Sequence, residues 1–111
     1  MPFAIEAFPE GKHVVLAVRG DVDIATAGTL RDELATTITR YEGIVVDLDD
    51  VPFLDSTGLG VLVAAYNKAA GEGRKVVLAR PQRIVKNALR LVQVDAVIDV
   101  YDDLDAARAA I

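Results

Sequence analysis

The sequence predicts a single α/β domain built on a mixed β-sheet, and three observations lead to this fold class. The chain opens with two β-type segments joined by a turn, as in an antiparallel hairpin. After residue 43, short apolar runs alternate with segments of helical periodicity, which is typical of parallel strands joined by helical crossovers. The 111 residues can bury one core and contain no linker or repeat, so we expect one domain over residues 1–111.

The opening hairpin is predicted over residues 3–20. FAIEAF (3–8) alternates apolar and polar residues, like a half-buried strand. PEGK (9–12) is typical of a turn. HVVLAVRG (13–20) is β-branched and apolar, so we expect it to form the second strand, and GDVD (20–23) to follow as a loop.

A first helix is predicted from residue 24, where apolar residues begin to recur at intervals of three and four. Asp23 or Thr26 is expected to cap its N-terminus, and Gly43 lies just beyond its end. The residues expected to form its apolar face are Ile24, Ala27, Leu30, Leu34, Ile38 and Tyr41.

The second half of the chain is expected to supply three strands and three helices, which makes about four helices in all. IVVDL (44–48) is a continuous apolar run and predicts a strand buried on both faces. KVVLA (75–79) and AVIDV (96–100) predict two more short strands, and DDLDAARAAI (102–111) a closing helix. Of the two helices between them, one begins near Ser56 with Leu59, Leu62, Val63 and Tyr66 on one face, and one begins near Pro81 with an apolar stripe of Ile84, Val85, Ala88, Leu89 and Val92.

Composition and charge narrow the classes of function. The net charge of -5 makes the chain a poor candidate for binding nucleic acid and suits a protein partner with a basic face. Because the sequence has no cysteine, it has no disulfide, thiolate nucleophile or cysteine-ligated metal. The first residues do not resemble a signal peptide, and no apolar stretch approaches the length of a membrane span. We therefore expect a soluble, cytoplasmic protein without a membrane partner.

The candidate site is DSTGLG (55–60), which stands where a helix should begin although each glycine costs a helix about 1 kcal/mol relative to alanine. One interpretation makes Ser56 a helix N-cap and the glycines points of close packing. The other makes Ser56 a phosphate acceptor, because a helix N-terminus tolerates added negative charge and the glycines leave the backbone open to a partner. The residues alone leave both interpretations open.

An enzyme is not expected. A nucleophile elbow has the pattern G-x-S-x-G, and Leu54 stands where its first glycine should be. The only histidine, His13, falls in a predicted strand and offers no evident base for Ser56. DLDD (47–50) is too short for a calcium loop and lacks its glycine, so we expect no metal and no cofactor.

Three segments of the sequence resemble a known family over nearly the whole chain. They are GDVD (20–23), VVDLDDVPFLDSTGLGVL (45–62) and LVQVDAVIDVYDDLDAA (91–107). Together they strongly resemble the STAS domain of bacterial anti-sigma factor antagonists. The resemblance implies the STAS fold, a central mixed sheet with helices packed on it.

The resemblance also implies a function. Unphosphorylated members bind an anti-sigma factor that is also a serine kinase, and so release the sigma factor for transcription. The kinase phosphorylates the serine that follows the aspartate, which breaks the complex, and a PP2C-type phosphatase restores it. Here that serine is Ser56, and the resemblance implies a partner-binding set of Asp21, Asp23, Asp55, Ser56, Thr57, Gly58, Leu59 and Gly60.

The resemblance leaves an alternative function open. Other STAS domains are adaptors in stress-sensing assemblies or subunits of lipid-transport systems, and in such a protein Ser56 would be only a helix cap. Thr57 stands where many members have a second serine.

Overall fold

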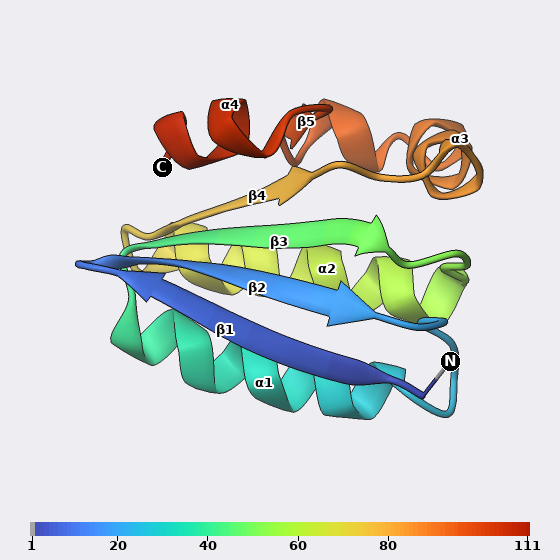
Figure 1. Cartoon of the computed structure of the whole chain (residues 1–111), viewed down its shortest axis with the longest axis horizontal. Helices are drawn as coiled ribbons and strands as arrows, with labels where there is room; N and C mark the ends of the chain where they lie inside the picture. The colour runs from blue at the N-terminus through green and yellow to red at the C-terminus, as the bar shows by residue number, and fades with distance from the viewer. Residues whose placement is uncertain (1) are drawn as a thin grey trace.

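The computed structural model describes residues 2–111 and contains a five-stranded mixed sheet (Figure 1). The strand order in space is the order in the chain. The first two strands are antiparallel and each later strand is parallel to its neighbour. The strands are β1 (Ala4–Glu10), β2 (His13–Arg19), β3 (Gly43–Asp50), β4 (Lys75–Ala79) and β5 (Val100–Tyr101).

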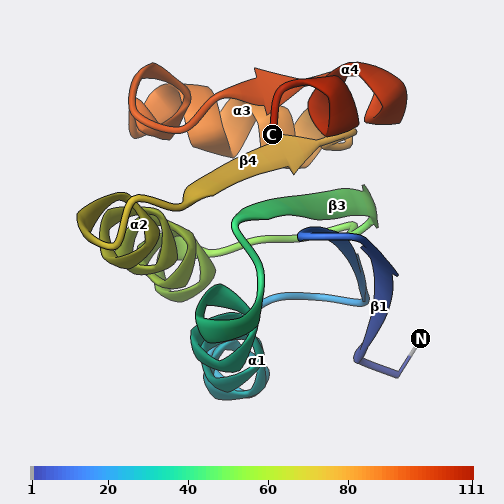
Figure 2. The same cartoon turned by 90° about the vertical axis from the view of Figure 1, so that its left-hand side faces the viewer.

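Four helices and one short 3-10 turn pack on this sheet. Helices α1 and α2 lie against one face, and α4 lies on the other (Figures 1 and 2). The predicted mixed sheet, with an antiparallel hairpin followed by parallel strands and four helices, is confirmed. The helices are α1 (Ala27–Arg40), α2 (Ser56–Gly71), α3 (Arg83–Leu91) and α4 (Leu104–Ala109), with the 3-10 turn η1 (Val94–Ala96).

The core lies mainly between the sheet and the helices α1, α2 and α3. In β2, Val14, Leu16 and Val18 point to this side and are buried, as the alternation of a half-exposed strand requires. Strand β3 is buried on both faces, as predicted, because α4 covers its other side with a smaller cluster. The central strand is thus held from two sides, and its carboxyl end is a rigid base for the connection to α2.

The predicted start of the first helix is wrong by about one turn. Helix α1 begins at Ala27, and Ile24 is 83% exposed instead of lying on the apolar face. The preceding loop is closed by its own polar groups: the backbone N–H of Ala25 donates to Asp23 Oδ1, and the hydroxyl of Thr26 donates to the carbonyl of Asp21. These local bonds compete with helix formation.

The C-terminal third differs from the prediction in two places. A strand is expected over residues 96–100, but β5 begins only at Val100. The residues before it belong to the region around η1, where Val94 and Ile98 are buried at a helical spacing of four. In α3 only Val85 and Leu89 of the predicted stripe are buried, while Ile84 and Val92 are exposed. Periodicity identified this helix correctly but overestimated the width of its buried face.

Candidate functional site

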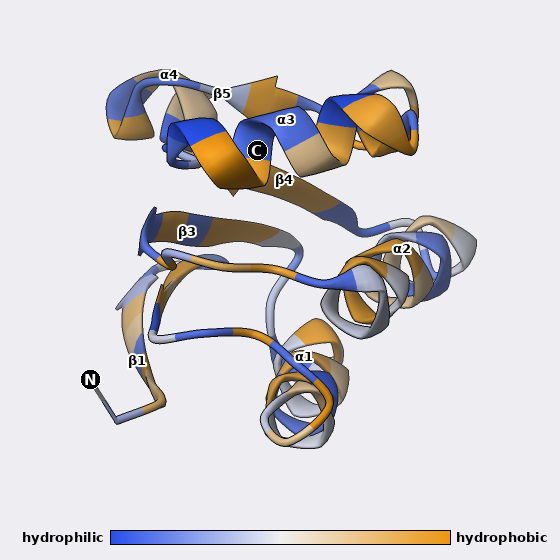
Figure 3. Cartoon of the chain, turned by 90° about the vertical axis from the view of Figure 1, so that its right-hand side faces the viewer, coloured by the Kyte–Doolittle hydropathy of each residue, from blue (hydrophilic) through white to orange (hydrophobic). Residues whose placement is uncertain are grey.

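Three helix N-termini meet at the carboxyl edge of the parallel strands. The chain leaves β2, β3 and β4 at this edge and enters α1, α2 and α3 (Figure 3). An isolated parallel bridge ties the first two connections together: Val22 N–H donates to Phe53 O at 2.9 Å, and Asp55 N–H donates to Val22 O at 3.1 Å. The bridge brings the loop that contains Asp21 and Asp23 beside the start of DSTGLG.

Asp55, not Ser56, caps helix α2. Asp55 has an extended backbone, and its Oδ1 accepts the N–H of Gly58 at 3.1 Å. This bond satisfies one of the free donors at the helix start. Ser56 is the first helical residue, its side chain is exposed, and its hydroxyl has no hydrogen-bond partner within residues 2–111. The interpretation of Ser56 as the N-cap is therefore wrong, and its hydroxyl is available for another role.

Replacing Asp55 by alanine is expected to destabilise the protein by about 1 kcal/mol, because the Gly58 N–H loses its acceptor. The matched control is Ser56→Ala, which removes an exposed hydroxyl from the next position and should change stability by less than about 0.5 kcal/mol. Urea denaturation followed by circular dichroism measures both. Equal losses in the two variants would mean that Ser56 shares the capping role.

The two glycines of DSTGLG have different environments. A Cβ on Gly58 would lie 2.5 Å from Leu54 Cδ1 and 2.6 Å from Val22 Cγ1, so this glycine lets the helix pack on the bridged loops. A Cβ on Gly60 would meet no atom within 4 Å. Gly58 is therefore explained by close packing, whereas Gly60 leaves bare helix surface near Ser56.

The predicted acidic residues also differ from one another in their exposure and in their hydrogen bonds. Asp23 is half-buried and organises its loop, since its Oδ1 accepts the Ala25 N–H at 2.9 Å. Asp21 is exposed, as are Asp49 and Asp50 at the end of β3. Asp49 and Asp50 form ion pairs with Arg80 and Arg19 at 3.7 and 3.8 Å. The acidic rim beside Ser56 therefore consists of Asp21, Asp23 and Asp55, which the bridge brings together.

The remaining predicted residues divide into exposed and buried ones. Thr57 is exposed beside Ser56, whereas Leu59 is buried in the core and supports the site from inside. Sequence reasoning missed two exposed apolar residues: Ile24, which it assigned to the core, and Phe53, which is 45% exposed. The sequence offered no signal that Phe53 would be exposed, since it stands between Val51 and Leu54, which are both buried. Ile24 and Phe53 lie close in sequence to the bridged residues Val22 and Leu54, so they add exposed apolar surface beside the acidic rim.

Within residues 2–111, neither the histidine nor a metal-binding cluster lies beside Ser56. His13 pairs with Gly43 at the start of β3, whereas Ser56 follows the end of that strand, so the two side chains lie about 20 Å apart. Among residues 2–111, no group of three histidine, cysteine or acidic side chains is arranged to hold a metal ion. In the same part of the chain, no helix is long and apolar enough to span a bilayer.

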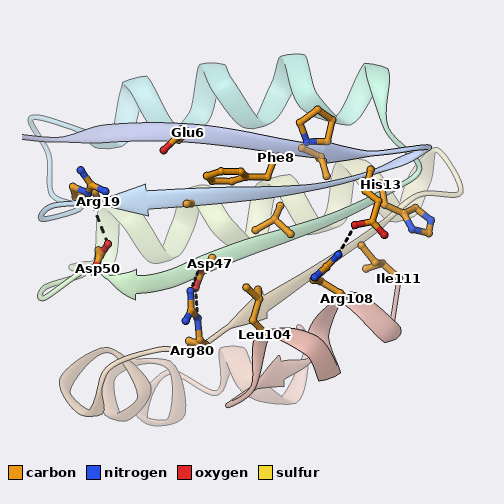
Figure 4. Close-up of a pocket in the computed structure, with 15 residues that line it drawn as sticks. Glu6, Phe8, His13, Arg19, Asp47, Asp50, Arg80, Leu104, Arg108 and Ile111 are labelled. Carbon is orange, nitrogen blue, oxygen red and sulfur yellow. Dashed lines mark hydrogen bonds and ion pairs between the residues drawn. The ribbon is translucent and has the colours of Figure 1, made fainter.

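A separate cavity lies on the other face of the sheet. It has a volume of about 470 Å³, and its walls are β1 and β2 on one side and α4 on the other (Figure 4). No residue of DSTGLG lines it. Apolar side chains form much of its floor, namely Phe8, Val15, Ala17, Leu104 and Ile111.

An ion pair between half-exposed Arg80 and buried Asp47 borders this cavity. Arg80 donates from Nη2 to Asp47 Oδ2 at 2.6 Å and from Nε to Asp47 Oδ1 at 3.1 Å. Asp47 is buried, and its hydrogen bond and charge raise the pKa of the Arg80 guanidinium above its usual value. Arg80 has φ of 53°, a left-handed conformation that is uncommon outside glycine.

Comparison with known proteins gives the same family from sequence and from structure. Residues 5–107 match the model of the STAS domain family. The anti-sigma-B factor antagonist of Bacillus subtilis is 27% identical over 85 residues, which cover 77% of this chain and 75% of that protein.

Two solved structures have the same architecture. An anti-sigma factor antagonist from Mycobacterium paratuberculosis has a TM-score of 0.91 and 25% identity, over 99% of this chain and 94% of that one. The Bacillus cell fate determinant SpoIIAA, in its phosphorylated form, has a TM-score of 0.74 and 16% identity, over 99% of this chain and 100% of that one. The second likeness shows the fold alone. Together with the family match over residues 5–107, these findings show that the chain belongs to the STAS domain family.

Proposed function

We propose that this chain is an anti-sigma factor antagonist controlled by phosphorylation of Ser56. Its unphosphorylated form binds an anti-sigma factor that is also a serine kinase, and this binding releases the sigma factor. Phosphorylation by that kinase ends the binding, and a PP2C-type phosphatase restores it. The proposal implies a cytoplasmic protein, because sigma factors act on transcription there. Similarity to proteins named anti-sigma factor antagonists supports it.

The observation that carries the proposal is the state of the Ser56 hydroxyl. It is exposed at the first position of α2, while the neighbouring Asp55 performs the capping that a serine in this position often performs. Removing or modifying the hydroxyl therefore leaves the helix cap in place. A kinase or a phosphatase could reach Ser56 without unfolding the helix start, and bare helix surface at Gly60 adds to this access.

Phosphorylation would change the charge of the rim strongly. A phosphoserine adds about -1.5 to -2 units of charge at pH 7. At Ser56 this charge would lie beside Asp55 and close to the acidic loop that contains Asp21. A partner whose basic groups match the unmodified rim would then meet a rim of different charge and shape. Mismatched charge at an interface costs several kcal/mol, which is enough to dissociate a complex.

The test of the charge mechanism uses Ser56→Ala and Ser56→Glu with the neighbouring Thr57→Ala and Thr57→Glu as matched controls. Binding to the purified anti-sigma factor kinase is measured by calorimetry. Ser56→Ala should bind like the unaltered chain, and Ser56→Glu should weaken binding by at least about tenfold, or about 1.4 kcal/mol. Because Thr57 is exposed at the next position, equal weakening by Thr57→Glu would show that charge at Ser56 has no special effect.

The acceptor itself is identified by mass spectrometry after incubation with ATP and the kinase. A single phosphate on Ser56 that is absent from Ser56→Ala is the expected result, with no phosphate on Thr57. If no phosphate forms with a kinase shown to modify another antagonist, and Ser56→Glu binds normally, the chain is instead a STAS adaptor or scaffold in a larger complex that uses no switch.

A further inference from the structure

The exposed apolar residues of this chain are concentrated near one edge of the sheet. Seven large hydrophobic side chains are exposed within residues 2–111. One of them, Phe8, lies on the sheet face that borders the cavity. The other six belong to the connections at the carboxyl edge or to α3 and the turn after it: Ile24, Phe53, Ile84, Leu91, Val92 and Val97. Two of these six side chains, Ile24 and Phe53, lie in the bridged connections beside Ser56, and the other four belong to α3 and the segment after it.

Helix α3 presents two different flanks. Its buried side contains Val85 and Leu89. At 100° per residue, Ile84, Ala88 and Leu91 lie on one flank of that side, and we call these three residues the α3 stripe. Ile84 and Leu91 are 65% and 83% exposed. The opposite flank contains only basic side chains, namely Arg83, Lys86 and Arg90.

Two contacts fix the direction in which the α3 stripe points. Lys86 Nζ donates to Asp102 Oδ1 at 2.7 Å, which turns the basic flank toward β5 and the start of α4. The α3 stripe therefore lies on the flank of the helix that is turned away from β5 and the start of α4. Gln82 Nε2 also donates to the Asp49 carbonyl at 2.8 Å, which holds the start of α3 against the end of β3. This bond places the start of α3 beside the strand end from which the chain continues to Phe53 and Ser56.

The sizes of stable interfaces support a surface larger than the Ser56 rim. A standard interface buries about 800 Å² per partner and involves about 20–30 residues on each side. The exposed rim residues around Ser56 are far fewer, and the adjoining surface must supply the rest. The α3 stripe is the apolar surface next to them, and apolar side chains form the desolvated centre of most interfaces.

Charge indicates the chemistry of the partner. The rim is acidic at Asp21 and Asp55, whereas the far flank of α3 has Arg83 and Arg90, neither of which is in an ion pair within residues 2–111. The surface is therefore acidic on one side of the α3 stripe and basic on the other. A matching partner has an apolar ridge with basic groups toward Ser56 and acidic groups toward α3.

We propose that the α3 stripe is the second part of the docking surface for the protein that binds at Ser56. This inference rests on the proposed function and adds to it a contact that is remote from the phosphate acceptor. The α3 stripe contributes affinity and orientation, and Ser56 contributes the switch. A change in the α3 stripe should therefore alter how tightly the kinase holds its substrate, without altering the transfer of phosphate to Ser56.

The test is the steady-state phosphorylation of Ser56 by the kinase purified through this activity. Leu91→Asp and Arg90→Glu should each raise KM by about tenfold or more and leave kcat within about twofold, because uniform binding is lost and the chemical step is kept. Phe8→Asp is the matched control, since Phe8 is also an exposed apolar residue but lies on the other face of the sheet. Its KM should not change.

The outcomes separate the two proposals. An unchanged KM for both Leu91→Asp and Arg90→Glu, with Ser56 still phosphorylated, would show that the α3 stripe is not a docking surface. The proposed function would remain intact. The absence of any phosphate on Ser56 in the unaltered chain would overturn both. An equal rise in KM for Phe8→Asp would attribute the effect to general damage and also reject the inference. Thermal unfolding of each variant shows whether the fold is retained.

Discussion

Replacing Arg80 by leucine is expected to destabilise the protein by roughly 2–4 kcal/mol at neutral pH. The reason is that Asp47 is 5% exposed and receives two hydrogen bonds from the Arg80 guanidinium. Without them its charge remains in a poorly hydrated position, where its other contact is a long bond of 3.3 Å from the Asp49 N–H. The expected value lies toward the lower end for a broken buried pair, because the Arg80 side chain is itself 36% exposed and water can enter.

A double variant tests this explanation of the Arg80 effect. Asp47→Val combined with Arg80→Leu removes both charges and should regain most of the lost free energy, since replacing a buried pair by apolar residues is often neutral. Urea denaturation of the two single variants and the double variant gives the coupling free energy. A double variant that is as unstable as Arg80→Leu alone would show that the loss comes from packing or from the left-handed backbone at Arg80, and not from the unpaired carboxylate.

Alanine substitutions at the two glycines of DSTGLG are expected to change stability in opposite directions. Gly58→Ala should destabilise the protein by about 1–3 kcal/mol, because its Cβ would overlap Val22 and Leu54 in a packed core. Gly60→Ala should stabilise it by up to about 1 kcal/mol, because the new Cβ meets open space and alanine favours the helix.

The glycine pair is measured by thermal and urea unfolding, and then by binding. If Gly58→Ala proves neutral, the bridged loops are looser than the Val22–Leu54 contact indicates. Gly60→Ala should be more stable but bind its partner less well if bare helix surface near Ser56 serves access. If Gly60→Ala is more stable and binds its partner as well as the unaltered chain does, access to Ser56 does not explain the glycine at position 60.

The sequence predicted the elements whose signal is local and repetitive. Alternation identified β1, and β-branched apolar residues identified β2. A continuous apolar run identified β3 as a strand buried on both faces. The same reasoning failed at Ile24, because periodicity detects an apolar side chain but cannot tell a core residue from an exposed contact. The exposure of Ile84 was missed for the same reason.

The details of the candidate site depend on contacts between distant segments. The motif identified DSTGLG and Ser56, but the sequence did not show that Asp55 takes the capping role or that Val22 pairs with Leu54. Likewise, Asp47 and Arg80 are 33 residues apart, and no pattern in the chain links them. Such pairs are set by the way loops pack on the finished sheet, which is a property of the whole fold.

The strand order has a consequence for how the sheet is assembled during synthesis. Because each strand lies beside the one that precedes it in the chain, no strand has to be inserted between two that are already paired. The sheet can therefore grow in the order in which the ribosome delivers it, with each new strand covering the edge left by the last. The starting edge, β1, contains Pro9, which has no N–H to donate to another chain. A nascent chain of this kind exposes one growing edge at a time, which limits its opportunity to pair with its neighbours on the same messenger RNA.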